Sequence, residues 1–302
     1  MAFGITSSYA GKAAGFYVNA ALKEAKSLDF LTMIENIKYK SNIQKYSNSG
    51  LITAAGCDFV SAGNLTGTEA TLETKNLMIN LDLCKAELLD SWEALQMRAG
   101  AGAPPPASFD DYVISYMGEI IADGVEGMIW QGTGANAFNG FGTTTTGVLA
   151  TNADVVDVAT VGGAGSAITA ANVIENLQNT VAAIPSAVYT KEDLYIYVGP
   201  RVYRLYIQAI SALGYLNAYN MTGDYEPIFE GIKLAVCPGQ LDNGIVAGQK
   251  SNMFFGTDLV SDTTRIQLMD MSQLDGSDNM RLVARFSGAV QTAIGGDVVF
   301  TS

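Results

Sequence analysis

The stretch SFDDYVISYMGEIIADGVEGMIW, residues 108–130, decides the fold class of this chain. Ser108 can cap a helix, and Asp110 and Asp111 place negative charge on its first turn, where the helix dipole favours it. Apolar side chains then recur at helical spacing: Phe109, Tyr112, Val113, Tyr116, Met117, Ile120, Ile121, Val125, Met128 and Ile129. About 22 residues at ~1.5 Å each give a helix roughly 33 Å long. We interpret this helix as a structural spine that ends at Gly132.

Upstream of the spine, the pattern alternates between helical and extended segments. Residues 12–28 are predicted to form an amphipathic helix, whereas 51–70 have the Gly, Ser, Thr and Ala content of a loop. Over 77–83 every second residue is apolar, which is the period of a strand with two unlike faces. A second helix is predicted over 85–98, and the prolines at 104–106 stiffen the connection that follows it.

Downstream of the spine, short helices and strands alternate before strands predominate. The predicted elements are the strand 155–161, the helix 170–183, the strand 194–198 and the helix 202–213. Pro200 lies where a first helical residue belongs, and Gly214 can cap the other end of that helix. From Ile232 onward we expect mainly strands, among them 265–271, 280–286 and 290–300. Asp275–Gly276 has the composition of a hairpin turn. The chain is therefore predicted to be an α+β protein.

The composition is that of a folded chain with few charges. Hydrophobic residues make up 48% of the 302 residues and charged residues 16%, which excludes a disordered chain. The length suffices for one large domain or two smaller ones with a sizeable core. The apolar content is explained either by that core or by surfaces that contact other chains, because monomers rarely expose large apolar patches. Both explanations stay open at this point.

The chain is strongly acidic. Seventeen basic against 30 acidic residues leave a formal net charge of −13. Direct DNA recognition is disfavoured, because it needs clustered Lys and Arg side chains that neutralise phosphates. The richest basic stretch, Lys38–Lys45, is interpreted as a solvated strand or arm.

The residue types exclude several catalytic and metal-binding arrangements. The absence of histidine rules out Ser-His-Asp and Cys-His nucleophile pairs and the H-E-x-x-H zinc site. Cys57, Cys84 and Cys237 are odd in number and lack C-x-x-C spacing, so we expect buried, reduced thiols in a cytosolic product rather than a disulfide framework. Residues 1–10 show no signal-peptide pattern, and no window approaches 18 uninterrupted apolar residues.

Glycine-rich segments offer the nearest match to a nucleotide site. Gly132–Ala137 fits G-x-G-x-x-A, but it follows a predicted helix, whereas a dinucleotide fold needs a strand there. Gly163–Gly165 does lie between a predicted strand and a helix, but Ile168 occupies the position of the third glycine. Gly248–Ser251 breaks the P-loop pattern between its glycine and its lysine. We therefore expect no cofactor.

Clusters of carboxylates have simpler explanations than chemistry. Asp270, Asp275 and Asp278 lie close in sequence, but the loop lacks the alternating ligands and the distal glutamate of an EF-hand, so turn and solvent roles are expected. Asp110 and Asp111 are adjacent, and on a helix their side chains diverge by about 100°, which prevents them from sharing a proton easily. The sequence predicts no catalytic residues and no metal site.

Several strings carry a family resemblance in combination. They are Ile79–Cys84 (INLDLC) ahead of a helix with Trp92, Met128–Gly132 (MIWQG) at the end of the spine, Leu194–Pro200 (LYIYVGP), Phe229–Leu234 (FEGIKL) and Phe255–Leu259 (FGTDL). In these strings and in the order of its elements, the chain resembles the major capsid proteins of tailed bacteriophages, which have the Hong Kong 97-type fold. The resemblance covers most of the chain.

The resemblance implies an α+β architecture of five segments. They are an N-terminal arm (1–50), an extended loop (51–83), a peripheral domain (84–164) with the spine helix (108–130), an axial domain (165–255) and C-terminal strands that return to the peripheral domain (256–302).

The resemblance also implies a function. Copies of a major capsid protein form hexamers and pentamers that close an icosahedral shell around the double-stranded DNA genome of the phage. Such a shell encloses DNA without binding it specifically, and the negative charge agrees with that. The implied partners are further copies of the chain, with scaffold, portal and cement proteins as additional candidates. The implied location is the virion, after synthesis in the host bacterial cytoplasm, with no enzyme activity and no membrane contact.

Two features of the family and two other functions complete the expectations. Some members link a loop lysine covalently to an asparagine of a neighbour, and Lys75 lies in the matching region, but without an identifiable partner we do not predict the reaction. Family-like sequence begins close to Met1. If the protein uses a scaffold, this favours a separate scaffold protein over a removable segment of the chain.

The alternative functions are an encapsulin-like compartment shell and a nucleotide-binding enzyme that uses the Gly-rich loops.

Overall fold

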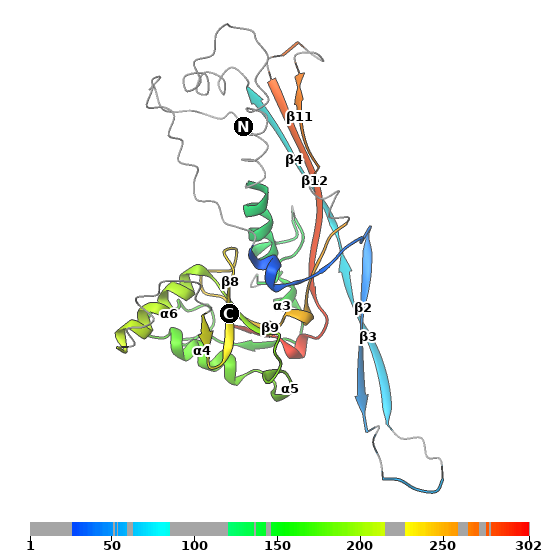
Figure 1. The fold of residues 1–302 in the computed structure, drawn as a ribbon, viewed down its shortest axis with the longest axis vertical. Helices are drawn as coiled ribbons and strands as arrows, with labels where there is room; N and C mark the ends of the chain where they lie inside the picture. The colour runs from blue at the N-terminus through cyan, green and yellow to red at the C-terminus, as the bar shows by residue number, and fades with distance from the viewer. Residues whose placement is uncertain are drawn as a thin grey trace. The chain divides into compact units, whose positions relative to one another are not determined.

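The structure, a computed structural model of the chain, describes most of its residues. The described residues are 26–50, 52, 54–58, 63–84, 120–135, 137–142, 146–214, 227–258, 265–271, 276–277 and 279–301. They fall into two compact units, a smaller one within 77–121 and 261–286 and a larger one within 23–76, 122–260 and 287–302. Each unit is described by itself, with the element labels of Figure 1.

Six strands of the larger unit form one mixed sheet, of which β8 and β9 are labelled in Figure 1. In their order across the sheet they are β5 (Val156–Val158), β13 (Val299–Thr301), β9 (Ile245–Gln249), β6 (Leu194–Val198), β8 (Ile232–Val236) and β7 (Ile228–Phe229). β5 and β13 are parallel, as are β6 and β8, whereas the other neighbours are antiparallel. The β7–β8 hairpin turns on Glu230 and Gly231, whose positive φ values of 48° and 83° suit a type I′ turn.

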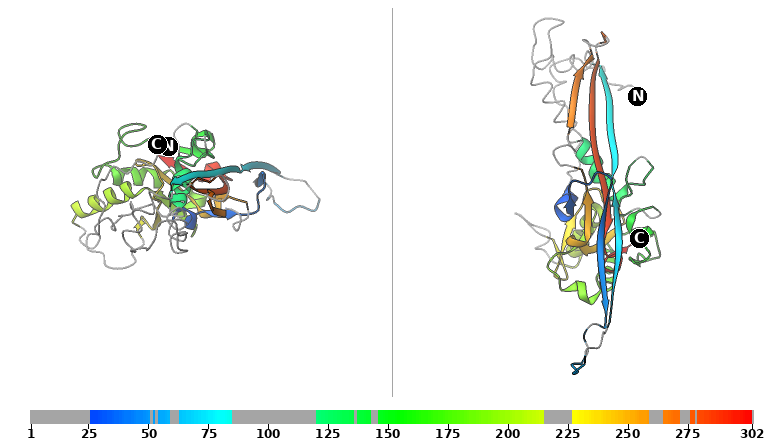
Figure 2. Two further views of the ribbon diagram at one scale, coloured as in Figure 1. Left: turned by 90° about the horizontal axis from the view of Figure 1, so that it is seen from above. Right: turned by 90° about the vertical axis from the view of Figure 1, so that its right-hand side faces the viewer.

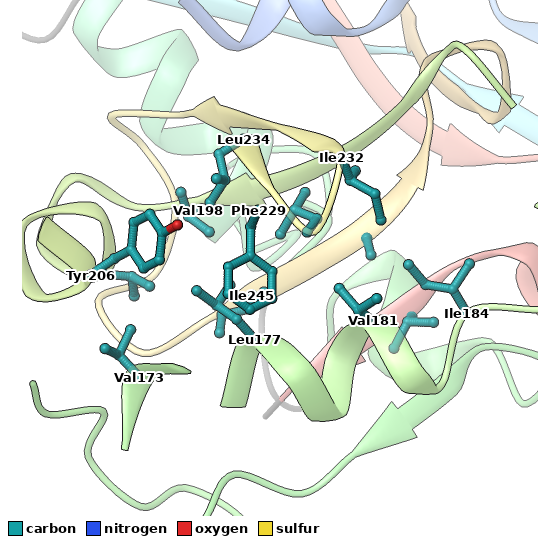
Figure 3. Packing of buried hydrophobic residues seen from close by; sticks show 14 of the residues in the cluster. Val173, Leu177, Val181, Ile184, Val198, Tyr206, Phe229, Ile232, Leu234 and Ile245 are labelled. Atoms are coloured by element: carbon teal, nitrogen blue, oxygen red, sulfur yellow. The ribbon is translucent and has the colours of Figure 1, made fainter. Parts of the chain in front are cut away.

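Helices pack against this sheet and complete the main core. They are α4 (Val173–Ala182), α5 (Ser186–Tyr189) and α6 (Pro200–Ala212). Figure 3 shows Leu177 of α4 and Tyr206 of α6 among the sheet residues Val198, Phe229 and Ile245, all within one buried apolar cluster. Helices α4 and α6 each bury one apolar stripe against the sheet. The residues of each stripe recur at the 3.6-residue spacing of a helix, as they do in the sequence.

Strand β6 lies inside the sheet, which explains its unbroken run of apolar residues. Successive side chains of a strand point to opposite faces. Leu194, Ile196 and Val198 lie in the core with the helices. Tyr195 and Tyr197 therefore point to the other face, where Tyr197 is fully buried as well. A strand buried on both faces needs no polar alternation, so the predicted strand 194–198 is confirmed.

A smaller sheet of the larger unit joins segments that are far apart in sequence. Strand β1 (Thr32–Ile34) runs parallel to β10 (Met253–Gly256), which in turn pairs antiparallel with residues 289–292 of β12 (Asn279–Thr292). The 3₁₀ helix η3 (Lys250–Asn252) connects β9 of the main sheet to β10, and η5 (Gly295–Asp297) connects β12 to β13. Two further short helices of this unit are the 3₁₀ helix η1 (Lys26–Phe30), which precedes β1, and α3 (Val148–Thr151), which precedes β5.

Apart from the helical residues 120–121, the described part of the smaller unit consists mainly of extended strands. Strand β11 (Arg265–Asp270) pairs antiparallel with the first half of β12, and β4 (Lys75–Cys84) pairs with β12 as well. An exposed ion pair joins Arg281 to Asp82 over 3.4 Å. Along β4 the odd-numbered residues from 77 to 83 are half-buried and the even-numbered ones are exposed, which confirms the predicted strand and its two faces.

The predicted ends of two helices are confirmed. Residues 120–131 are helical and the helix stops at Gly132, as predicted for the spine. Helix α6 begins at Pro200, and Gly214, with φ of 86°, follows its last turn. The first part of the spine, the helix 85–98 and most of the helix 12–28 lie outside the described residues.

Two predictions about extended segments are wrong. The predicted loop 51–70 includes the first seven residues of a ten-residue strand, β3 (Asn64–Glu73), because pairing with a distant segment overrides a composition typical of loops. The predicted strand 290–300 is interrupted by η5, because the chain leaves one sheet at Thr292 and enters the other at Val299.

Candidate assembly elements

The larger unit carries a long hairpin that pairs only with itself among the described strands. β2 (Lys40–Ser49) and β3 form ten antiparallel pairs, from Lys40 opposite Glu73 to Ser49 opposite Asn64. Figures 1 and 2 show the two strands side by side over their whole length. At ~3.3 Å per residue the ribbon is roughly 33 Å long. An isolated two-stranded hairpin is at best marginally stable in water, so the attachment of this one to the larger unit matters for its stability.

The hairpin leaves apolar side chains uncovered. Tyr46 is 65% exposed and Leu65 is 61% exposed, and Ile52, beyond the end of β2, is 97% exposed. Tyr46 lies opposite Gly67, so Leu65 is its diagonal neighbour on the same face of the ladder. Every described residue in 50–58 and 63–69 is exposed too. Large apolar side chains that are exposed and adjacent are typical of an interaction site.

Polar contacts on the same face hold the register of the ribbon. Lys40 and Glu73 form an exposed ion pair over 2.9 Å, and Asn42 Nδ2 donates a hydrogen bond to Glu69 Oε2 over 3.0 Å. The hydrogen bond and the charge of Glu73 raise the pKa of Lys40. Exposed pairs contribute little to stability, so these contacts orient the strands rather than hold the hairpin in place.

The base of the hairpin is fastened to the larger unit. Leu72 and Ile37 are buried together in a small core cluster. Their side chains press on the backbone of Gly256, where a Cβ would lie only 2.6 Å from Leu72 Cδ2. Gln291 Nε2 also donates to the carbonyl of Thr71 over 2.9 Å. The hairpin thus has a rigid base, and its outer part has no such support in the described residues.

A buried carboxylate joins η1 to the spine helix. Glu126 is fully buried in residues 120–131. It accepts hydrogen bonds from Ser27 N at 3.1 Å, Ser27 Oγ at 2.5 Å and Gly239 N at 3.1 Å. No Lys or Arg of the described residues forms an ion pair with it. Because a carboxylate without water needs strong donors, these three bonds fasten η1 and the loop of Gly239 to the helix.

We call the contact of Glu126 with Ser27 and Gly239 the clip. Aromatic rings lie around it. Trp130 Nε1 donates to Ser27 Oγ over 2.6 Å, and the Trp130 ring lies 5.6 Å from that of Tyr197. Tyr197 OH donates to the carbonyl of Phe30 over 2.9 Å. Sequence reasoning missed the clip, although Glu126, one turn before the apolar Ile129 and Trp130, was a visible signal.

The three cysteines differ in exposure. Cys57 and Cys84 are exposed, so the prediction of buried thiols is wrong for both, and it is confirmed for Cys237. Burial raises the pKa of Cys237 to about 12, while a hydrogen bond with Ser27 lowers it and the charge of Glu126 raises it further. Cys237 is therefore a neutral thiol at neutral pH, because a low-dielectric site disfavours its charged form.

We expect two of the three thiols to react with an aromatic disulfide reagent in the native, unassembled chain at about pH 8, because the thiolate is the attacking species. Cys237 should react only in denaturant. Cys57→Ser and Cys84→Ser should each remove one fast equivalent, measured by the absorbance of the released thiol. Three fast equivalents in the native chain would contradict the buried position of Cys237.

The raised pKa of Cys237 also predicts that the free energy of unfolding falls from about pH 9 to 12, since the thiol of the unfolded chain ionises at a lower pH than that of the folded chain.

The first Gly-rich segment, Gly132–Ala137, has a packing role. A Cβ on Gly132 would lie 2.2 Å from the carbonyl oxygen of Phe138, so glycine is needed for close approach of two backbones. Lys75 Nζ donates to the carbonyl of Gly134 over 3.0 Å. The lysine considered for a covalent link is thus hydrogen-bonded within the chain.

The other glycine-containing segments are a turn and the junction of β9 with η3. Gly163–Gly165 lies between β5 and α4, and its two glycines have φ of 108° and 77°. In Gly248–Ser251, Ser251 Oγ donates to Asp193 Oδ2 over 2.5 Å and Gln249 Nε2 donates to Asp193 Oδ1 over 3.0 Å. Partial burial alone would raise the pKa of Asp193, but these bonds outweigh it and lower the pKa. The segment wraps a carboxylate of its own chain.

Metal ligands do not gather in the part of the chain that the structure describes. No group of three or more Cys, Asp or Glu side chains is placed there to hold an ion. Asp275, Asp278, Asp110 and Asp111 lie outside the described residues. None of the described helices is both long and apolar enough to cross a membrane.

Comparison with known proteins identifies the fold. No family model and no curated protein matches the sequence. Among solved structures, the capsid of a native GTA particle matches with a TM-score of 0.61 at 12% identity, over 93% of this chain and 91% of that one. The capsid of the Myoviridae phage XM1 matches with a TM-score of 0.60 at 12% identity, over 95% and 94%. A virus-like particle from Pyrococcus furiosus matches with a TM-score of 0.50 at 9% identity, over 91% of both chains.

The chain therefore has the α+β fold of phage capsid proteins, the Hong Kong 97-type fold. The matches extend over nearly the whole length of both chains, so the fold is shared as a whole rather than in one lobe. The fold class expected from the sequence is confirmed.

Proposed function

We propose that the chain is the major capsid protein of a tailed bacteriophage, and that copies of it assemble into the icosahedral head that encloses the double-stranded DNA genome. A shared fold alone does not imply a shared function. The observation that carries the proposal is the hairpin β2–β3, which is long, exposed on both faces at its outer part and fastened only at its base.

The hairpin is a means of joining subunits. A ribbon roughly 33 Å long reaches well beyond its own core and can lie on a neighbouring copy. Its exposed Tyr46 and Leu65 would lose their contact with water there. A specific interface of standard size buries about 800 Å² per partner, and many such contacts in one lattice add up to a stable shell.

The five segments expected from the sequence acquire proposed roles. We assign 1–50 as the arm, 51–83 as the extended loop, 84–164 as the peripheral domain, 165–255 as the axial domain and 256–302 as the returning C-terminal strands. Hexamers and pentamers of the chain would form around the axial domains. The clip would then connect the arm to the rest of the subunit, and the base of the hairpin would connect the extended loop to it.

The other parts of the proposal concern partners and place. The protein would act mechanically, without catalysis, in the virion, after synthesis in the bacterial cytoplasm. DNA would be enclosed without specific binding, in agreement with the net charge of −13. Scaffold, portal and cement proteins are further candidate partners. An encapsulin-like compartment is not favoured, because the capsids of the native GTA particle and of phage XM1 match the fold with TM-scores of 0.61 and 0.60, against 0.50 for the virus-like particle.

Electron microscopy of the protein tests the proposal. We expect the purified chain, alone or with the scaffold protein of its own genome, to form rings of five or six subunits and closed particles of uniform diameter. Particles from infected cells should contain nuclease-protected double-stranded DNA. A protein that stays a compact monomer at every concentration in both settings would contradict a shell function, and particles filled with a cargo enzyme would favour the compartment.

A further inference from the structure

A cleft of about 570 Å³ opens at the N-terminus of helix α6 in the larger unit. Side chains of Arg201 and Arg204 line it, together with Gln240 and Asp242 from the loop after β8. The cleft adjoins the clip, since Pro238 and Gln240 on either side of Gly239 line it, but the contacts of the clip do not involve its two arginines.

The charges in the cleft are unbalanced. The first turn of α6 carries no acidic residue, and its N-cap, Gly199, provides no side-chain cap. The helix dipole places partial positive charge at this end of α6. The positive charges of the two arginines add to it and make the electrostatic interaction there unfavourable. Arg201 donates to Asn243 Oδ1, a neutral group, over 2.5 Å. Neither Arg201 nor Arg204 forms an ion pair with any described residue.

A donor without an acceptor lies in the wall of the same cleft. Gln240 is only 3% exposed, and its Nε2 has no hydrogen-bond partner among the described residues. Its Oε1 accepts from Leu241 N over 3.1 Å, which orients the amide. Buried polar groups in folded proteins nearly always have partners, so an unpaired donor beside a cleft indicates a missing acceptor. Two guanidinium groups, a helix N-terminus and this amide all favour an anion.

We propose that this cleft binds a carboxylate side chain of a neighbouring copy of the chain. The proposal rests on the proposed shell function and specifies one contact within it. The chain has 30 acidic residues against 17 basic ones, so a second copy offers an acidic surface to a basic cleft. Arginine forks bind carboxylates with two parallel hydrogen bonds, which orients the partner as well as attracting it.

The geometry of such a contact suits a ring. The basic cleft on one copy meets a different, acidic surface on the next, so the contact is head-to-tail rather than self-complementary. Head-to-tail contacts generate closed rings when their rotation closes. Asp242, the one carboxylate among the lining residues, leaves the cleft with a net positive charge because two arginines oppose it.

Charge reversal at Arg204 tests the proposal. Arg204 is exposed and forms no ion pair with the described residues, so Arg204→Glu should leave the unassembled chain folded, with an unchanged unfolding midpoint. We expect the concentration needed for half-maximal ring formation to rise about tenfold or more, because a rim charge is replaced by a repelling one. Lys191→Glu, the same change at another exposed position of the larger unit, is the control and should assemble normally.

The outcomes separate this proposal from the shell function. If the native chain and Lys191→Glu assemble and Arg204→Glu assembles equally well, the cleft has no role between copies. If none of the three assembles, the shell function fails first. If inorganic phosphate raises the unfolding midpoint of the native unassembled chain but not of Arg204→Glu, while assembly is the same for both, the occupant is a free anion and the second-copy assignment is overturned.

Zero-length cross-linking identifies the partner directly. Arg204→Lys keeps the charge and provides an amine that a carbodiimide joins to a carboxylate in contact with it, with loss of water. In rings formed from equal parts of ¹⁴N- and ¹⁵N-labelled chains, we expect mass spectrometry to find mixed-isotope peptides that link position 204 to one acidic residue. Only same-isotope links, or no link in well-formed rings, would overturn the proposal.

Discussion

A chain whose hairpin is cut back to its base is expected to stay folded and to form no closed shells. The change replaces residues 44–69 by Asn-Gly between Ile43 and Ala70, which lie opposite each other in the ladder. An Asn-Gly pair makes the two-residue turn that such a ladder prefers. The removed residues whose burial is described are exposed, except Lys45, which is half-buried, whereas the buried anchor Leu72 is kept.

The cut-back chain separates folding from assembly. Because the core loses nothing, the unfolding midpoint of the unassembled chain should shift by no more than about 3 °C. Electron microscopy should show no closed particles, since every contact made by the hairpin is lost from every copy. Normal particles in normal yield would contradict the assembly role of the hairpin.

Two double variants show which face of the hairpin makes the contact. Tyr46→Ser with Leu65→Ser removes the apolar side chains from one face and should reduce the yield of particles severely. Lys45→Ser with Thr68→Ser changes a directly opposed pair on the other face and serves as the control. Equal defects in both would indicate that the hairpin matters through its backbone rather than through its apolar face.

Glu126→Ala, which removes the buried carboxylate, is expected to destabilise the folded chain by about 3–4 kcal/mol. Two buried backbone N–H donors lose their acceptor in this variant. Glu126→Gln should cost less, about 2 kcal/mol, since its amide oxygen can replace one carboxylate oxygen while its NH₂ faces a donor. Urea unfolding of the unassembled chain measures both variants.

The clip can also be distinguished from the general effect of losing a charge. Glu192→Ala removes an exposed carboxylate and should change the free energy of unfolding by less than about 0.5 kcal/mol. Ser27→Ala in a double-mutant cycle with Glu126→Ala should show coupling of at least about 1 kcal/mol, because the two side chains share a hydrogen bond. An unfolding midpoint unchanged by Glu126→Ala would contradict the role of the clip.

Local periodicity predicted many elements correctly, for a simple physical reason. The alternation over 77–83 and the apolar run 194–198 reflect burial of one face or of both, and burial follows directly from residue type. Pro200 and the Gly132 end of the spine helix were predictable because these residues restrict or free the backbone at their own positions. The absence of histidine excluded whole classes of catalytic site by composition alone.

Predictions failed where distant residues determine the structure. Residues 64–70 have the composition of a loop and form a strand, because Lys40–Ser49 supplies the partner for their backbone groups. Glu126 is a conspicuous residue in its helix, but its donors Ser27 and Gly239 lie about 100 residues away on either side. No local pattern encodes such contacts.

The sequence by itself determined the α+β class, the main helices and strands, and a charge and residue composition unsuited to DNA recognition and to histidine-dependent catalysis. These properties depend on single residues or on neighbours within a few positions. The tertiary structure alone decided that β2 and β3 pair into a hairpin fastened only at its base, that a buried carboxylate fastens η1 to the spine, and that two arginines line one cleft with an unpaired amide. Each of these arises when the folded chain brings segments far apart in sequence within hydrogen-bonding distance or to one surface, and packing of the whole core determines which segments meet.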